Sequence, residues 1–573
     1  MEHILRNLLR IGIVSLYPAV LLLSFFLLRR KETWRSVMKA HGRRILLNTL
    51  IIGAVLGLGI IVFFRLEDTV YSYDYAWHWT RVLQLREMFF VNPQGIMPLI
   101  HQSLLRDDYT YLPALLTFSS SILKTGYGFF CLTNMIAYYL PFIMILQLLY
   151  FRYCSEQKWV PVLGSLVFYP AYYTIFFGEV DLGGMVFLVM IYILVLFEDF
   201  EKIDLIDNLS VNLYGFLMIF FRRWYLYSLV VFYLCYVIKF LFHYHFRPFT
   251  AEAGKTFARM ILSGLALLGV LLVFYRPYVQ RILGNNFSED FAYNDKEGKL
   301  IGFVNYLSPL GMTVCLYGAY ILLKQGKWET LVNTLVLIIV PTAMFWSIQS
   351  YEYHHYCIIM PALVILFGYG LYGFGLLGPQ LGRTVLYAML GAQLVLIYYP
   401  NQIDFPLFTS LKKTPQKMEY KQELADFAYW LRERGGEGMY FYLSSGSAVL
   451  NEDMIRNSIL PDIHPPLLYQ AILDIRDGFP HKLGDLSYVI TIDPIQYIDQ
   501  DYQHMYDIIT EAIWHEPLVQ AVYEPVHERT IAGLKLTVYR RTGEYTPEIK
   551  QYFYDKMLEY YPDKGDYFAY ILE

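Results

Sequence analysis

Long apolar runs separated by short polar turns dominate the first 400 residues of this chain of 573 residues. Many of these runs approach the roughly 20 residues that an α-helix needs to cross a hydrocarbon core. The pattern predicts a polytopic α-helical membrane protein with about twelve spans. The expected spans are residues 11–28, 46–64, 128–150, 159–177, 183–198, 206–221, 224–242, 260–275, 304–323, 330–348, 357–377 and 384–400.

A different pattern begins at about residue 401. Charged helical stretches such as QKMEYKQELADFAYWLRER alternate there with short β-like runs, namely MYFYLS, LSYVITI and LKLTVYRR. The sequence therefore predicts two domains. Residues 1–400 would form the transmembrane domain, with interfacial helices in a large loop at 65–127, and residues 401–573 would form a soluble α/β domain.

The distribution of basic residues predicts how the chain is oriented. The loop after the first span carries Arg29, Arg30, Lys31, Arg35, Lys39, Arg43 and Arg44. Loops rich in Lys and Arg stay in the cytoplasm, so the next loop faces outside. Twelve spans then place on the outer face the loop 65–127, the turn near Glu179, residues 276–303, the turn near His354 and the C-terminal domain.

Two segments leave this count open. YLPALLTFSSSILKTG, residues 111–126, is apolar enough to be a span, but Pro113, the serine run and the short length favour a helix lying in the interface. Residues 206–242 are too long for one ordinary span and short for two spans with a loop between them, so we expect a tight hairpin. Either alternative, taken alone, would move the C-terminal domain to the cytoplasm.

Composition excludes several classes of protein. A net charge of -4 gives no excess of either sign that points to nucleic acid. The sequence contains no Gly-rich phosphate loop, paired CxxC or HExxH, so nucleotide-binding and zinc-site interpretations lack support. The predicted outer domain has no cysteine, and RRKETWRSVMKAHGRR follows the first apolar stretch where a cleaved signal would have small residues. We expect a membrane anchor there, and a bacterial cytoplasmic membrane.

Two adjacent arginines interrupt the apolar stretch MIFFRRWYLYSLVV. Arg222 and Arg223 fall at the predicted outer end of the hairpin, where arginine is less frequent than in cytoplasmic loops. Charges at such positions often mark ligand sites, and a guanidinium holds a phosphate through two hydrogen bonds. We expect them to bind a lipid phosphate. The alternative is that both side chains extend to lipid headgroups, or that the turn is cytoplasmic.

Acidic residues follow two of the predicted spans. Asp74 lies in YDYAWHW, and His78 is four residues later, so both would share one face of a helix and could act on one substrate or, with Asp74 as a ligand, on one metal ion. The alternative for Asp74 is a helix N-cap. The turn GEVDLGG contains Glu179 and Asp181, which are suited to holding a divalent cation, Mg²⁺ or Mn²⁺, or to orienting an acceptor. A solvated turn is the alternative there.

Two further outer segments carry candidate residues. IQSYEYHHYCIIMP brings Glu352, His354 and His355 to the same predicted face, although histidine pairs of this kind are often structural. The loop 276–303 begins with Arg276 and is a candidate lid over the site.

In their order along the chain, these motifs resemble the membrane glycosyltransferases of the GT-C fold, closest to the protein O-mannosyltransferase and aminoarabinose-transferase branch. The resemblance rests on the acid in YDYAWHW, the proline-bearing segment YLPALLTFSSSILKTG, the acidic turn GEVDLGG, the basic FRRWYLY, the motif YHHYCIIMPAL and a soluble outer domain.

The resemblance implies a polyprenyl-phosphate-linked sugar as donor, and as acceptor a hydroxyl of an envelope glycan, lipid or protein. It implies that Asp74 is the base, and our hypothesis is a single displacement with inversion. A cation is needed on the leaving phosphate, a role for Arg222 or Arg223. Glu179, Asp181 and His78 would orient the acceptor or a metal ion.

The chain also departs from this family. Many relatives have a second acid where this chain has Tyr75, and Arg-Tyr where it has His355 and Tyr356. Glu67 and Asp68 are rival candidates for the base. The alternative function is a transporter, flippase or assembly protein for lipid-linked saccharides.

Overall fold

The computed structural model describes most of the chain and divides it into two compact units. The helical unit comprises Met1–Phe63 and Trp77–Thr414, and the C-terminal unit comprises Phe64–Ala76 and Pro415–Glu573. The described residues are 2–106, 111–121, 123–153, 174–247, 251–284, 300–348, 353–376, 415–435, 440–462, 467–470, 483–498 and 503–573, with a few isolated positions between them.

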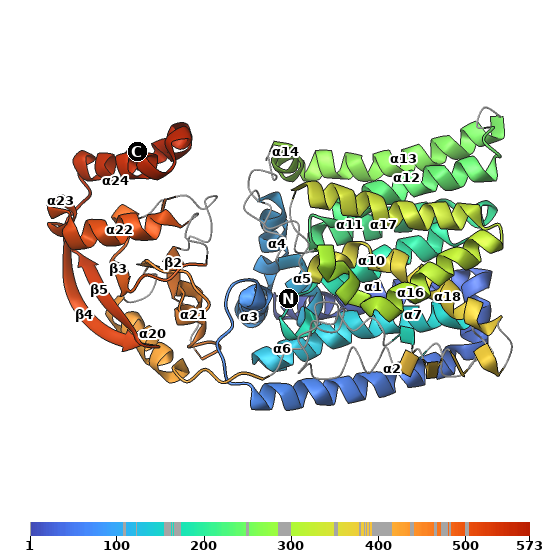
Figure 1. Cartoon of the computed structure of the whole chain (residues 1–573), viewed down its shortest axis with the longest axis horizontal. Coiled ribbons are helices and arrows are strands. Elements are labelled where there is room, and N and C mark those ends of the chain that lie inside the picture. The colour runs from blue at the N-terminus through green and yellow to red at the C-terminus, as the bar shows by residue number, and fades with distance from the viewer. Residues whose placement is uncertain are drawn as a thin grey trace. The chain divides into compact units, whose positions relative to one another are not determined.

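The helical unit consists of α-helices and short 3₁₀ or π turns (Figure 1). Its α-helices are α1 (Glu2–Arg30), α2 (Glu32–Leu66), α3 (Asp74–Val91), α4 (Ile96–Leu105), α5 (Tyr111–Ser121), α6 (Tyr127–Asn134), α7 (Leu140–Tyr153), α10 (Asp181–Ile191), α11 (Leu205–Phe221), α12 (Tyr225–His243), α13 (Ala251–Phe274), α14 (Arg276–Gly284), α16 (Leu300–Lys324), α17 (Trp328–Ile348) and α18 (Met360–Gly375). The short turns are η1 (Pro93–Gly95), η2 (Met135–Tyr139), η3 (Tyr192–Leu196), η4 (Phe200–Lys202) and η5 (Tyr353–Ile358).

Among the described residues, 6 helices are long and apolar enough to cross a membrane. Shorter apolar helices cover Asp181–Leu196, Leu205–Phe221, Gly311–Lys324 and Met360–Gly375. Each of these elements coincides with an expected span, and together they have the character of a multi-pass membrane protein. The expected spans at 159–177 and 384–400 lie largely outside the described residues.

The tight hairpin expected over residues 206–242 is confirmed. Only residues 222–224 separate α11 from α12, and the two helices contact each other. The interfacial helix expected at 111–126 stays a prediction. Its helical part, α5, has 11 residues, and Tyr111 to Phe118 are all buried because α5 packs against α1, α6 and α11. It is therefore enclosed by protein, and at about 16 Å it is too short to span.

Helix α10 and its continuation η3 form the most enclosed element, since every residue from Asp181 to Leu196 is buried. Two adjacent glycines allow this close packing. A Cβ on Gly183 would overlap the ring of Phe221, and a Cβ on Gly184 would overlap the ring of Tyr225. Without side chains at these positions, the end of α11 and the start of α12 pack directly on the start of α10.

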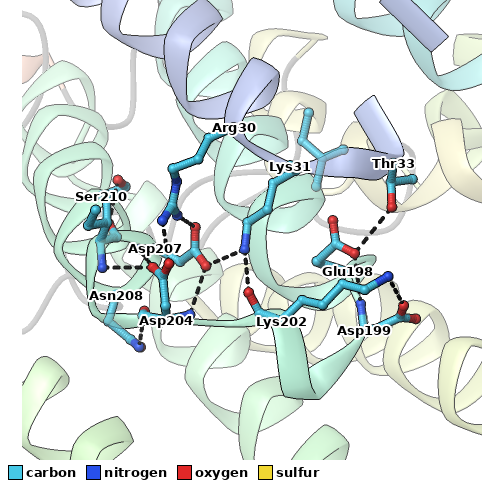
Figure 2. A network of polar contacts seen from close by, with 12 residues as sticks. Arg30, Lys31, Thr33, Glu198, Asp199, Lys202, Asp204, Asp207, Asn208 and Ser210 are labelled. Carbon is cyan, nitrogen blue, oxygen red and sulfur yellow. Dashed lines mark hydrogen bonds and ion pairs between the residues drawn. The ribbon is translucent and has the colours of Figure 1, made fainter. Parts of the chain in front are cut away.

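A network of ion pairs fixes the opposite end of α10 and α11 (Figure 2). Arg30, at the end of α1, pairs with Asp204 and Asp207 at the start of α11. Lys31 is buried, pairs with Asp207, and donates a hydrogen bond of 2.6 Å to the carbonyl oxygen of Lys202. The network thus joins the predicted basic loop to the turn that connects α10 with α11.

The C-terminal unit contains a five-stranded sheet with the order β2-β1-β3-β5-β4. Strand β1 is parallel to β2 and β3, whereas β5 is antiparallel to β3 and β4. The strands are β1 (Tyr440–Leu443), β2 (Leu468–Gln470), β3 (Tyr488–Asp493), β4 (Tyr523–Ile531) and β5 (Leu534–Arg541). The three predicted strands are β1, β3 and β5, while β2 and β4 were not predicted.

Helices cover both faces of this sheet (Figure 1). Phe441 and Ile490 face a core shared with α20 (Lys421–Gly435) and α21 (Glu452–Asn457). Tyr442 and Val489 face a second core, shared with α22 (His504–His515) and α24 (Pro547–Tyr560). This alternation of neighbouring residues between two cores makes the unit a three-layer α/β/α sandwich.

Candidate functional site

Three turns that are far apart in the sequence meet at the end of α10, α11 and α12 that is opposite the ion-pair network. They are residues 177–180 before α10, residues 222–224 between α11 and α12, and η5 before α18. These are the segments GEVDLGG, FRRW and YHHYCI that the sequence predicted on one face of the membrane. The structure brings them together, and we call their residues Glu179, Asp181, Arg222, Arg223, Trp224, His354 and His355 the turn cluster.

A buried ion pair lies at the centre of the turn cluster. Arg222 Nε lies 3.1 Å from Asp181 Oδ1, and Arg222 Nη2 donates to Asp181 Oδ2 at 3.4 Å. Asp181 is fully buried and Arg222 is only 4% exposed. The Tyr225 hydroxyl donates to the Asp181 carbonyl oxygen at 2.6 Å. Two of the predicted residues therefore neutralise each other and connect the start of α10 to the hairpin.

A second pair joins the acidic turn to the histidine turn. His354 Nδ1 lies 3.3 Å from Glu179 Oε1, and both side chains are largely buried. Burial raises the pKa of the Glu179 carboxyl above its ordinary value, and His354 opposes this shift. Burial lowers the pKa of His354, but the charge and hydrogen bond of Glu179 outweigh it, so the net shift is upward. Glu179 Oε2 accepts no hydrogen bond from the described residues.

Trp224 connects the two pairs, and the sequence reasoning missed it. The Arg222 Cζ atom lies 4.8 Å from the centre of the Trp224 ring system, and the rings of His355 and His354 lie 4.7 and 5.5 Å from it. The indole Nε1 has no hydrogen-bond acceptor among the described residues. The position of a tryptophan next to two arginines in an aromatic stretch was the available signal.

The two arginines differ in exposure. Arg222 is buried against Asp181, whereas Arg223 is partly exposed at the turn. With the carboxylates ionised, the two arginines balance Glu179 and Asp181, and protonation of His354 would add one positive charge.

Asp74 and His78 both lie on α3, but their environments differ. The Asp74 side chain is exposed at the first residue of the helix, whereas His78 is 1% exposed. No hydrogen bond to the Asp74 carboxylate occurs among the described residues, so nothing there supports its alternative role as an N-cap. Asp74 belongs to the C-terminal unit, and His78 belongs to the helical unit.

The rival acids before Asp74 are also in the C-terminal unit. Asp68 pairs with Lys421 at 2.6 Å, and its backbone bonds to Gln416 and Met418. Glu67 is partly buried. The Asp68 carboxylate is already paired with Lys421, and its backbone is hydrogen-bonded to residues 416 and 418. Asp68 is therefore a weaker candidate for a base than Asp74.

Arg276 lies outside the turn cluster. It is the exposed first residue of α14, whose Tyr278 hydroxyl donates to the carbonyl oxygen of Ile219 near the end of α11. Glu352 and residues 285–299 of the predicted lid lie outside the described residues.

The acidic turn does not fit a divalent cation held by both carboxylates. Asp181 Oδ2 accepts a hydrogen bond from Arg222, Asp181 Oδ1 lies 3.1 Å from Arg222 Nε, and Glu179 Oε1 lies 3.3 Å from His354. The described residues include no group of three or more His, Cys, Asp or Glu side chains placed to hold a metal ion. The Mg²⁺ or Mn²⁺ expected at Glu179 and Asp181 stays a prediction.

Comparisons with known proteins give no further assignment, because no family model matches this chain and no curated protein matches it.

Proposed function

We propose that this chain is a membrane glycosyltransferase that moves a sugar from a polyprenyl-phosphate carrier to an acceptor hydroxyl. One observation carries the proposal: three separate turns contribute two carboxylates, two guanidinium groups and a histidine pair to one end of a buried helix bundle. Such groups are suited to binding a phosphate and a hydroxyl group at the same place.

Arg223 is the proposed ligand of the donor phosphate. It is the arginine of the turn with partial exposure, and it sits beside a guanidinium that is already neutralised by Asp181. Arg222 stays paired with Asp181 and holds the turn in place, so it does not bind the substrate. Separation of the sugar from its carrier leaves an additional negative charge on the phosphate, which a nearby guanidinium stabilises.

Asp74 is the proposed base. This role is supported by the sequence resemblance and by the exposure of the Asp74 carboxylate. The carboxylate takes the proton of the acceptor hydroxyl, and the acceptor oxygen attacks the anomeric carbon. The bond from that carbon to the phosphate oxygen breaks, and the polyprenyl phosphate leaves with the electron pair. A single displacement of this kind inverts the anomeric configuration.

Glu179 is the proposed ligand of the acceptor. Its second carboxylate oxygen is buried and accepts no hydrogen bond from the described residues, whereas its first is held by His354. A carboxylate oxygen in this state is a good acceptor for a hydroxyl group.

The transporter alternative has less support. A transporter for a charged saccharide needs polar or charged groups along its path. Between Asp181 and Leu196, and between Asn208 and Phe221, the helices at the centre of the bundle carry no charged residue. Their charges are instead concentrated at the two ends, in the turn cluster and in the ion-pair network.

The test is the release of sugar from a panel of labelled polyprenyl-phosphate sugars by the purified protein in lipid, with a membrane extract as acceptor. We expect Asp74→Asn to lower turnover by about 100-fold or more, as the loss of a general base does. Arg223→Ala should raise the KM for the donor. Arg259→Ala, an exposed arginine of α13, is the matched control and should change neither.

Three results would overturn parts of this proposal. Turnover of no donor by the wild type would remove the glycosyltransferase. A loss of at most severalfold in Asp74→Asn would reassign the base, and retention of the anomeric configuration would exclude the single displacement.

A further inference from the structure

The C-terminal unit includes a segment that the sequence assigned to the transmembrane domain. Residues Phe64–Ala76 run from the last residues of α2 to the first residues of α3 and belong to this unit, although more than 300 residues separate them from the rest of it. Val70 is 7% exposed and packs in the same core as Leu424 and Phe427 of α20. The segment is thus part of the fold of the unit.

Hydrogen bonds at both ends hold this segment. At the beginning, the Asp68 amide donates to the Gln416 carbonyl oxygen at 2.8 Å, and the Met418 amide donates to the Asp68 carbonyl oxygen at 2.7 Å. At the end, Asn457 Nδ2 donates to the Tyr71 carbonyl oxygen at 2.7 Å, and the Tyr73 amide donates to Asp453 Oδ2 at 2.5 Å. The last two contacts come from helix α21.

The α21 residues that make these contacts are themselves fixed. Asp453 is 1% exposed, pairs with Arg456 at 2.5 Å, and accepts from the Tyr469 hydroxyl at 2.9 Å. Asn457 Nδ2 also donates to Asp453 Oδ2 at 3.0 Å. Asp453 and Asn457 therefore form a rigid pair of hydrogen-bonding groups that faces the backbone of residues 71–73.

The backbone that they hold is strained. Tyr73 has a φ of 52°, in the left-handed region that a tyrosine seldom adopts, and its carbonyl oxygen accepts from the Ala76 amide to close the first turn of α3. Strain of this kind persists only where surrounding contacts fix the conformation. Asp74, the first residue of α3, comes directly after this residue.

We infer that the C-terminal domain positions Asp74, with Asp453 and Asn457 as its positioning residues. The domain holds the backbone before Asp74 in one conformation and so fixes where α3 begins and where the Asp74 carboxylate points. The catalytic part of this inference rests on the proposed function, in which Asp74 is the base. The structural part concerns only the docking of residues 64–76 and is independent of it.

Hydrogen–deuterium exchange on the full-length protein in lipid tests the docking. Asn457→Ala leaves the Tyr71 carbonyl oxygen without its donor, and we expect the amides of residues 67–76 to exchange about tenfold faster than in the wild type. Asp453→Ala should have a similar effect. Asp453→Asn keeps an oxygen for the Tyr73 amide and should restore most of the protection.

Ser444→Ala is the matched control, because it removes a buried hydroxyl of the same unit that bonds to Tyr506 and Thr510 and contacts no residue of the segment in the described hydrogen bonds. It should leave exchange at 67–76 unchanged. Unchanged exchange at 67–76 in both Asn457→Ala and Asp453→Ala would overturn the docking.

Kinetics tests the positioning. With a donor that the wild type turns over, Asn457→Ala should lower kcat about tenfold or more and leave the KM for the donor unchanged, because a misplaced base slows the chemical step. Faster exchange with an unchanged kcat would overturn the positioning role. If the wild type turns over no donor, the proposed function fails, while the exchange result still decides whether the segment is docked by α21.

Discussion

At the scale of single residues, Arg222 and Arg223 are neighbours in sequence with different surroundings. The sequence could place both at the end of a hairpin, because charge in an apolar stretch is conspicuous. It could not show that Asp181 lies opposite Arg222, because that pairing depends on how α10 packs against α11. The same is true of Glu179 and His354, which are 175 positions apart by subtraction of their residue numbers and still form a pair.

Substitution of the two arginines should separate their roles. Arg222→Ala leaves the fully buried Asp181 without its cation, which we expect to cost about 3–5 kcal/mol of stability. Arg223→Ala should leave the melting temperature nearly unchanged and weaken donor binding. Thermal unfolding in detergent and the KM for the donor measure the two effects.

An apolar double variant provides the control. Asp181→Leu with Arg222→Met removes both charges, and it should recover much of the stability lost in Arg222→Ala because no buried charge is left unpaired. Equal melting temperatures for Arg222→Ala and Arg223→Ala would contradict the assignment of Arg222 to the fold.

The Glu179–His354 pair should make stability depend on pH. Both folded-state pKa values are raised, so the folded protein binds more protons than the unfolded chain, and stability falls as pH rises. The stabilisation that protonated His354 contributes is fully present below its ordinary pKa of about 6.5. It is lost as the pH rises through the raised pKa of the folded state. The charged neighbours of this pair include Asp181 and Arg222.

His354→Gln should remove the pH-dependent stabilisation that His354 contributes. We expect its melting temperature to decline less steeply than that of the wild type as the pH rises above about 6.5. His515→Gln, an exposed histidine of α22, is the control and should keep the wild-type slope. Parallel curves for His354→Gln and the wild type would contradict the prediction.

At the scale of helices and strands, the sequence was informative where elements are long and apolar. The span boundaries of α11, α12 and α17 lie close to those predicted, because hydrophobicity and turn residues determine them locally. Strand β2, with three residues, and the half-exposed strand β4 were missed, because neither has a long apolar run. The burial of α5 was also missed, because composition alone does not distinguish a protein neighbour from a lipid one.

Gly184→Ala should disturb the contact between α10 and α12. The added Cβ would overlap the Tyr225 ring, and Tyr225 donates to the Asp181 carbonyl oxygen. We expect a loss of about 1–3 kcal/mol in stability, which is typical of overpacking. Gly269→Ala in α13 is the matched control, because a Cβ there meets nothing within 4 Å. Unfolding in detergent should show no loss for it, and a comparable loss in both variants would refute the packing argument.

Asp207→Asn should be the most damaging change in the ion-pair network. Asp207 has no exposed side-chain surface and pairs with Arg30 and with buried Lys31. Its neutralisation leaves Lys31 buried without a carboxylate, and we expect about 3–5 kcal/mol of destabilisation. Asp199→Asn removes an exposed pair with Lys202 and should cost about 0–1 kcal/mol. Similar melting temperatures for the two variants would show that the network is not structural.

At the scale of the whole molecule, the sequence indicated a membrane domain followed by an α/β domain, from the change in pattern near residue 401. It gave no sign that Phe64–Ala76 belongs with the C-terminal unit. That grouping depends on one buried valine and a few backbone hydrogen bonds, which leave no periodic pattern in the sequence.

The ends of the bundle give a topological prediction. Lys31 and Lys202 lie together in the ion-pair network, whereas Arg223 and His354 belong to turns at the opposite end of α10–α12. A single cysteine at position 202, which is exposed, should therefore react with an impermeant maleimide from one side of the membrane, once the five native cysteines are replaced. A cysteine at the partly exposed position 223 should react from the other side. Labelling of positions 202 and 223 from the same side would contradict the arrangement.

The ties at both ends of α10 and α11 have a mechanical consequence. Sliding α10 along α11 would break the pair between Asp181 and Arg222 at one end. At the other end, about 24 Å away along α10 and η3, Lys31 binds both Asp207 of α11 and the Lys202 carbonyl oxygen. The two helices are therefore fixed at both ends, and we expect them to move as one body. Among the six candidate spans of the described residues, α13 has the least buried apolar window, at 17%, so its displacement from the bundle would cost the least internal packing.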